Sequence, residues 1–172
     1  MEAAKYLAVE TLRDGRPVEI RALRPDDQTD LLAAVERTSA KSRYRRFFGA
    51  KRYFSDKEIA FFVNVDFVDH VALVAVVEEG GRPTIVGGGR YVVVRPGQAE
   101  LAFAVVDQYQ GQSIGAALLR HLIAIARHAG LTELIADVLA DNIGMLKVFE
   151  KCGLRVSTRR EAGIVRISLQ LT

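Results

Sequence analysis

The stretch VVDQYQGQSIGAALLRHL, residues 105–122, places an apolar strand pattern directly before an amphipathic helix pattern, with a polar loop between them. The loop contains three glutamines and the glycines Gly111 and Gly115. A helix that starts after such a loop presents free amide groups and the positive end of its dipole, and both attract phosphate. Glycine lacks a Cβ, so the backbone there can touch a ligand. An ordinary strand-to-helix turn is the alternative, which a glycine pair alone leaves open.

Two common phosphate loops are excluded at this position. The sequence has no GK[ST] triplet to hold magnesium and a terminal phosphate. The nicotinamide-dinucleotide fingerprint needs a third glycine and a later acidic residue after a parallel strand. A phosphate loop here is therefore of another kind.

The rest of the chain has the pattern of a mixed α/β protein. Apolar runs at 70–79, 84–96 and 98–106 predict three antiparallel strands, and the glycines of the second run predict a bulge or a close backbone approach. The helix after the loop should bury the stripe Ile114, Leu118, Leu122 and Ile125, with Gly130 as its C-terminal cap. Further elements are expected as a strand and helix cap at 17–27, helices at 30–38 and 41–48, a helix opened by the capping box Ser55–Glu58, a strand at 132–140, a helix at 142–153 and a strand at 163–171.

This order of elements predicts the fold class. We expect an α/β fold with a mixed, mostly antiparallel sheet of about six to seven strands flanked by helices. The length of 172 residues and the absence of any linker pattern favour a single domain over residues 1–172.

The overall composition narrows the class of protein. The net charge of +3 is too small to argue for nucleic acid, although it suits a site for a polyanionic small molecule. The single cysteine, Cys152, excludes an intrachain disulfide and fits a reducing compartment. No run is apolar over the length of a membrane span, no secretory signal pattern is present, and the three histidines lack metal-site spacing. We expect a cytoplasmic protein without a metal, membrane or nucleic-acid partner.

The loop resembles the coenzyme A pyrophosphate loop of the GNAT acetyltransferase superfamily, written [QR]-x-x-G-x-[GA]. Gln110, Gly111, Ile114 and Gly115 match as they stand, whereas Ser113 occupies a position where the family normally has glycine. The Cβ of Ser113 should crowd the diphosphate or strain the turn, because residues other than glycine avoid left-handed backbone. Its hydroxyl, in turn, can cap the helix or donate to a phosphate oxygen.

Two further segments carry the resemblance. DNIGMLKVFEKCGL, residues 141–154, is similar to the family's next helix, which an asparagine opens and a K-x-G-[FL] turn closes. VEIRALRPDD, residues 18–27, is similar to the family's opening strand and cap. The resemblance therefore covers nearly the whole chain in the family's order.

The resemblance implies that acetyl-CoA is the acyl donor and that the sheet splays beside the strand before the loop. The pantetheine arm would pair with the backbone of that strand, and the pyrophosphate would sit on the amides of residues 112–116. Lys147, on the later helix, is a candidate for the adenosine 3′-phosphate, with a solvated surface charge as the alternative. The residues expected to bind the coenzyme are Phe103, Ala104, Val105, Val106, Gln110, Gly111, Gln112, Ser113, Ile114, Gly115, Ala116, Asn142 and Lys147.

Glu100 is the expected general base, because a protonated amine has no lone pair with which to attack a thioester. It stands on the strand with the pantetheine contacts, on the face of Ala102 and Ala104, where small apolar neighbours should desolvate it. Bacterial protein lysine acetyltransferases of the superfamily carry a glutamate in a similar strand. The alternative is a solvent-exposed glutamate at a strand end.

Many family members protonate the leaving thiolate with a tyrosine, but the matching position here is Phe149.

The segment SRYRRFF resembles a segment that covers the acceptor site in those lysine acetyltransferases. Arg43, Arg45 and Arg46 are therefore expected to bind the acceptor, since guanidinium groups recognise carboxylates and phosphates well. A solvated basic helix is the alternative. The sequence thus predicts an acetyl-CoA-dependent N-acetyltransferase that modifies a primary amine, with a protein lysine favoured. Acetylation of a small amine, or acyl-CoA binding without catalysis, are the alternatives.

Overall fold

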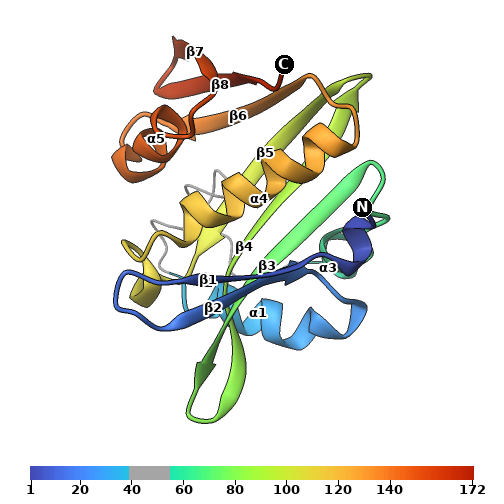
Figure 1. The fold of residues 1–172 in the computed structure, drawn as a ribbon, viewed down its shortest axis with the longest axis vertical. Coiled ribbons are helices and arrows are strands. Elements are labelled where there is room, and N and C mark those ends of the chain that lie inside the picture. Colours follow the sequence, from blue (N-terminus) through green and yellow to red (C-terminus); the bar gives the residue numbers. More distant parts are fainter. Residues whose placement is uncertain (39–54) are drawn as a thin grey trace.

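The structure, a computed structural model, describes residues 1–38 and 55–172. Within this part, the chain folds into one sheet of eight strands in the order β1-β2-β3-β4-β5-β6-β8-β7 (Figure 1). The strands are β1 (Leu7–Thr11), β2 (Pro17–Ala22), β3 (His70–Glu79), β4 (Arg82–Arg95), β5 (Gln98–Val105), β6 (Glu133–Leu139), β7 (Arg155–Glu161) and β8 (Ile164–Gln170). The helices are α1 (Gln28–Glu36), α3 (Asp56–Val63), α4 (Ile114–His128) and α5 (Ile143–Glu150), with short 3-10 turns at Ala3–Lys5, Pro25–Asp27 and Asp107–Tyr109.

The predicted mixed α/β fold is confirmed, but the sheet has eight strands instead of six to seven. The two edge strands account for the difference. β1 alternates between exposed and half-buried residues, and β7 is exposed at all but one position. Neither strand therefore has the apolar run that marks a buried strand in a sequence. None of the helices in the described ranges is long and apolar enough to cross a membrane.

The sheet splays between β5 and β6, as the resemblance implied. These two strands form the parallel pair in an otherwise antiparallel sheet, and they pair only from Gln98 with Glu133 to Glu100 with Ile135. Beyond Glu100, β5 stays paired with β4, while β6 pairs with β8. Figure 1 shows β6, β7, β8 and α5 as a group set apart from the other strands, with α4 crossing the sheet beside the gap.

Helix α4 forms the centre of the core on one face of the sheet. The predicted stripe is confirmed, because Ile114, Leu118, Leu122 and Ile125 are each at most 2% exposed. The helix ends as predicted at Gly130, which is left-handed and donates to the carbonyl of Arg127, while the next amide donates to Ala126. The capping box of α3 is also confirmed, because Ser55 and Glu58 each accept a hydrogen bond from the other's amide at 3.1 Å.

The glycines of β4 let α4 approach the sheet closely. A Cβ on Gly89 would lie 2.8 Å from the Phe103 ring and 3.2 Å from Leu122, whereas one on Gly88, which faces the other side, would meet only the Leu73 carbonyl at 3.5 Å. The register shifts where Ala75 pairs with Gly87 and Val76 with Ile85, so Val86 is an extra residue that makes a bulge in β4. Both features expected from the glycine run are therefore present.

These two glycines give a matched pair of substitutions. Gly89→Ala should destabilise the protein by about 1–3 kcal/mol, because the new methyl group overpacks the contact between α4 and β5. Gly88→Ala should change stability by less than about 0.5 kcal/mol, because its methyl group makes an ordinary contact. Urea denaturation of both variants measures the difference, and equal losses would contradict this account of the packing.

Candidate active site

A cleft of about 1160 Å³ opens where β5 and β6 separate. Its walls come from β5, the loop before α4, one side of α4 along nearly its whole length, the middle of β6, and α5. Eleven of the thirteen residues expected to bind the coenzyme line it, namely Phe103, Ala104, Val105, Gln110, Gly111, Ser113, Ile114, Gly115, Ala116, Asn142 and Lys147. Segments distant in the sequence are therefore brought to one site by the splay of the sheet.

The loop before α4 forms one end of the cleft. Gly111 and Ser113 both have left-handed backbone, with φ of 82° and 72°. The first hydrogen bond of the helix runs from the Ala117 amide to the Ser113 carbonyl. The amides of residues 114–116 precede that bond and are free of helical partners. This end of the cleft thus has the free amides and helix dipole that suit a phosphate.

Ser113 shows the backbone strain that its Cβ predicted, because a left-handed serine costs on the order of 1 kcal/mol. The capping role was wrong, since its side chain makes no cap hydrogen bond to α4. The hydroxyl oxygen instead accepts a hydrogen bond of 2.9 Å from Nε of Arg13, in the turn between β1 and β2. No pattern around Arg13 in the sequence pointed to this contact, which joins residues a hundred positions apart.

Gln112 and Val106 do not line the cleft. The Gln112 side chain accepts a hydrogen bond from the Asp14 amide in the β1–β2 turn. Val106 is buried, and its amide donates to the Val86 carbonyl of β4 at 2.8 Å. Because backbone groups alternate along a strand, the amide of Phe103 is directed toward the gap. The carbonyl of Val105 has the same direction and accepts a hydrogen bond from the Gln110 side chain.

A network of hydrogen bonds among charged and polar side chains holds the segment before the loop. Tyr109 donates a hydrogen bond to Glu79, which also accepts two from Arg37 at 2.9 and 3.0 Å. The hydrogen bonds from Arg37 and then from Tyr109 hold the pKa of Glu79 below its ordinary value. Arg16 stacks on the Tyr109 ring. The network fixes the segment that leads from β5 into the loop.

Glu100 lies at the point where the sheet divides. It is the last residue of β5 paired with β6, and it lines the cleft. The expected desolvation was wrong, because Glu100 is exposed: the strands part here, and none of the elements within residues 1–38 and 55–172 covers the carboxylate. Arg166 interacts electrostatically with Glu100, and it forms a two-point hydrogen-bonded ion pair with Asp137 at 2.8 and 2.9 Å. Glu100 is thus open to water and to a ligand in the cleft.

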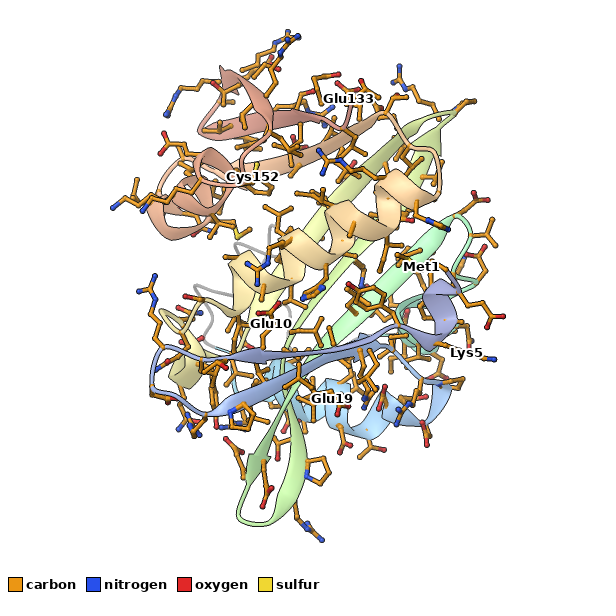
Figure 2. The ribbon with its side chains drawn as sticks, in the orientation of Figure 1. Met1, Lys5, Glu10, Glu19, Glu133 and Cys152 are labelled. Carbon is orange, nitrogen blue, oxygen red and sulfur yellow. The ribbon has the colours of Figure 1, made fainter. Side chains whose placement is uncertain are left out.

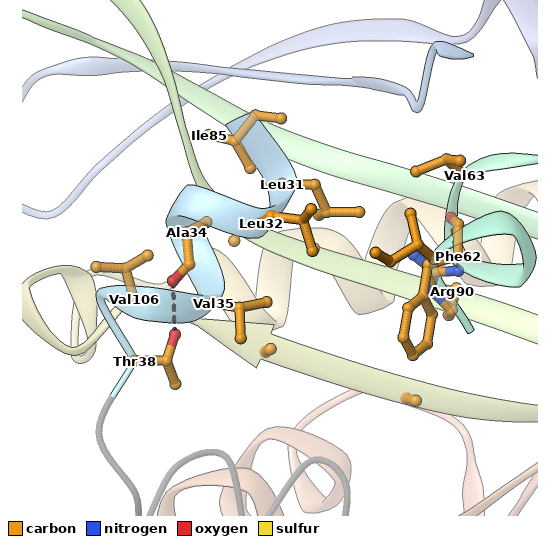
Figure 3. Close-up of a pocket in the computed structure, with 15 residues that line it drawn as sticks. Leu31, Leu32, Ala34, Val35, Thr38, Phe62, Val63, Ile85, Arg90 and Val106 are labelled. Carbon is orange, nitrogen blue, oxygen red and sulfur yellow. Dashed lines mark hydrogen bonds between the residues drawn. The ribbon is translucent and has the colours of Figure 1, made fainter. Parts of the chain in front are cut away.

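A small apolar cavity of about 70 Å³ lies on the other side of β5, between the sheet and helices α1 and α3 (Figure 3). Ala102 and Ala104 line both this cavity and the cleft, so only small side chains separate them. Thr38, which donates to the Ala34 carbonyl, closes one end, and Arg90 stacks on Phe62 at the other (Figure 3). Arg43, Arg45 and Arg46 lie outside the described residues.

Phe149 is the residue expected to stand at the tyrosine position of the resembled family. It lines the cleft, is 1% exposed, and makes an edge-to-face contact with Phe103 at 6.2 Å between ring centroids. Cys152 is half-buried at the end of the same segment (Figure 2). An aromatic contact without a hydroxyl therefore forms this wall.

Comparisons with known proteins agree with this geometry. The model of the acetyltransferase (GNAT) family matches residues 41–154. The chain is 36% identical over 138 residues to Acetyltransferase PA5475 of Pseudomonas aeruginosa, covering 80% of this chain and 74% of that protein. It is 32% identical over 158 residues to Acetyltransferase Pat of Mycolicibacterium smegmatis, covering 90% of this chain but 46% of Pat, so it spans about half the length of that relative.

Among solved structures, the GNAT domain of S. lividans PAT is similar with a TM-score of 0.85 and 35% identity, over 95% of this chain and 96% of that domain. A putative acetyltransferase from Salmonella typhimurium, solved with acetyl-CoA, has the same fold with a TM-score of 0.69 at 20% identity, over 90% of this chain and 94% of that one. The loop, the splayed strands and these matches agree, and the chain belongs to the GNAT family of acetyltransferases.

Proposed function

We propose that this domain transfers an acetyl group from acetyl-CoA to the amine of a protein lysine. The observation that carries the proposal is the continuity of the cleft, which runs from the free amides at the start of α4, along the gap-facing edge of β5, to Glu100. A donor with a diphosphate at one end and a thioester at the other matches that order. The protein lysine is favoured as acceptor because the chain is similar to the GNAT domain of PAT and to Pat.

The proposed reaction is direct transfer. The neutral amine attacks the thioester carbonyl, the C–N bond forms, and the C–S bond breaks. Glu100 takes the amine proton directly or through one water, which its exposure supports. The thiolate takes a proton from water, because Phe149 has no hydroxyl proton to give, and the hydroxide left behind takes up the proton that Glu100 accepted from the amine. Recognition of the acceptor by Arg43, Arg45 and Arg46 stays a prediction.

The acceptor class is tested with acetyl-CoA labelled in the acetyl group. The protein is incubated with a cell extract and, separately, with a panel of small amines, and the labelled products are identified by mass spectrometry. Label on protein lysines supports the proposal, and label on small amines alone contradicts it. Donor binding by calorimetry without any labelled product favours the second candidate, a module that binds acyl-CoA without catalysis.

A substitution at Gly115 tests the phosphate end of the cleft. Gly115 lines the cleft, and a Cβ added there would meet no atom within 4 Å. Gly115→Asp should weaken acetyl-CoA binding by about tenfold or more, because it adds a negative charge beside the diphosphate. The fold should not suffer, since an acidic residue stabilises the first turn of a helix. Gly115→Asn is the matched neutral control and should bind more tightly than the aspartate form. Calorimetric titration measures both, and equal affinities would place the diphosphate elsewhere.

A further inference from the structure

The turn between β1 and β2 reaches the loop that begins α4. Arg13 donates from Nε to the Ser113 hydroxyl at 2.9 Å, and the Asp14 amide donates to the Gln112 side chain at 3.2 Å. Behind the turn, Glu10 of β1 lies beside α4 (Figure 2), where it pairs with Arg120 at 2.9 Å and with His121 at 2.7 Å. The hairpin is therefore fastened along α4, with its tip at the mouth of the cleft.

We propose that Arg13 binds the diphosphate of the acyl donor and that Ser113 is the positioning residue that holds Arg13 there. The proposal rests on the proposed function, since it concerns the same donor. Arg13 is exposed, and it lines the cleft together with Gly111, Ser113 and Gly115. A residue from the hairpin thereby joins a site that the loop alone was expected to form.

Charge gives the first reason. Residues 107–119, which contain the loop and the start of α4, include no lysine or arginine, so the backbone amides act there without a cation of their own. Arg120, the first basic residue of the helix, pairs with Glu10. Lys147 lies on α5, across the cleft from the loop. Arg37 and Arg16 contact Gln108 and Tyr109 at the start of this segment, but neither lines the cleft. Among the described residues, Arg13 is the cationic side chain that both bonds to the loop and lines the cleft.

The geometry of the guanidinium gives the second reason. The bond to Ser113 uses Nε, which leaves the four N–H groups on the two terminal nitrogens for a ligand. The neighbouring carboxylate, Asp14, already forms an ion pair with Arg16, whose Nε lies at 3.0 Å and whose terminal nitrogen lies at 2.9 Å from it. Among the described residues, no carboxylate forms an ion pair with Arg13. A planar guanidinium group with its terminal N–H groups free can donate to two oxygens of a phosphate at once.

Ser113 gives the third reason. A serine with a φ of 72° is strained, and its hydroxyl does not offset the strain by capping α4. The hydroxyl is instead engaged by Nε of Arg13. Serine in the place of the family's glycine therefore has a function in this chain, which is to fix the direction of Arg13.

The test is calorimetric titration of acetyl-CoA, its 3′-dephospho form and S-acetylpantetheine, which lacks the diphosphate. Arg13→Ala should bind the first two about tenfold more weakly and the third with unchanged affinity, because charge-assisted bonds to the diphosphate are lost. Ser113→Ala keeps the Cβ and removes the hydroxyl, so it should cause a smaller loss in the wild-type background and none in the Arg13→Ala background. Arg159→Ala is the control, because it removes the same charge from β7, outside the cleft.

Each outcome bears on a different part of the proposal. Binding by Arg13→Ala within twofold of the wild-type protein would overturn it and leave the proposed function intact. A loss that disappears with the 3′-dephospho donor would also overturn it, because Arg13 would then bind the 3′-phosphate. Additive effects of the two substitutions would remove the positioning role of Ser113. A wild-type protein that binds none of the donors would overturn the proposed function together with this inference.

Discussion

Replacing Glu100 by glutamine should reduce the rate of acetyl transfer by roughly 100- to 10,000-fold, which is the usual contribution of a general base. The fold and the affinity for acetyl-CoA should be unchanged, because Glu100 is exposed and lies at the opposite end of the cleft from the phosphate loop. Glutamine keeps the size and hydrogen-bonding oxygen of the side chain but cannot accept the proton. Steady-state kinetics with acetyl-CoA and the labelled acceptor measure the effect.

Two further measurements separate a general base from a binding residue. The Michaelis constants for acetyl-CoA and for the acceptor should stay within about twofold of the wild-type values while kcat falls, because a general base acts on the rate and not on binding. Glu161→Gln on β7 removes the same charge from an exposed position outside the cleft and should leave the rate unchanged. A Glu100→Gln enzyme with a near-normal rate at neutral pH would remove Glu100 from the mechanism.

Replacing Asp27 by alanine should destabilise the protein by about 3–5 kcal/mol, because it removes the two-point partner of the buried Arg21 charge. Among the described residues, the ion pair that Arg21 then keeps is the longer contact from Nε to the partly exposed Glu19, at 3.6 Å. The Arg21 and Asp27 residues are 8% and 5% exposed, and their side chains form a two-point pair at 2.8 and 2.9 Å. Asp27 also accepts a hydrogen bond from the Arg24 amide, which closes the turn into α1. The loss corresponds to a fall in melting temperature of roughly 6–20 °C for a domain of this size. Thermal and urea denaturation measure it.

The pH dependence of stability tests the same pair. Burial on its own would raise the pKa of Asp27, but the hydrogen bonds from Arg21 and the Arg24 amide outweigh it and hold the pKa below its ordinary value. A depressed pKa in the folded state gives stability that is complete above the unfolded pKa of about 3.9 and is lost as the pH falls through the folded pKa. The difference between the wild-type protein and Asp27→Ala should therefore shrink in acid.

A double substitution is the control for Asp27. Arg21→Met with Asp27→Leu removes both charges and keeps apolar volume, so it should recover much of the stability that Asp27→Ala loses. A loss of less than about 1 kcal/mol in Asp27→Ala would show that Arg21 finds water or another partner, and would contradict the importance of the pair.

Sequence patterns predicted the elements in which the spacing of apolar residues shows which side is buried. The apolar stripe and the terminal Gly130 of α4 were correct, because a helix that packs on a sheet must repeat its apolar residues along one face. The edge strands β1 and β7 were missed, because strands exposed on one side carry few apolar residues. The loop before α4 was recognisable for a related reason, since its glycines and the helix start are local features.

Contacts between distant segments were not predictable in this way. The bond between Arg13 and Ser113 depends on how the β1–β2 hairpin lies along α4, and no spacing in the sequence encodes it. The exposure of Glu100 depends on where β5 and β6 part, which side-chain alternation within β5 does not reveal. Both features arise only when the whole sheet is assembled, so a local sequence pattern does not predict them.

The short parallel contact between β5 and β6 sets a limit on how this protein can be stabilised. Each further residue pair that joined these strands would add ladder hydrogen bonds. It would also shorten the unpaired part of β5 by about 3.3 Å, the rise of one residue along a parallel strand. The next position to pair would be Leu101, whose main chain borders the cleft. Substitutions that favour a more complete sheet would therefore be selected against in an active acetyltransferase, as a local case of the trade-off between stability and activity. The unfinished ladder therefore represents stabilisation that this fold forgoes, and the proposed function requires that the edge of β5 stay vacant for the acyl donor.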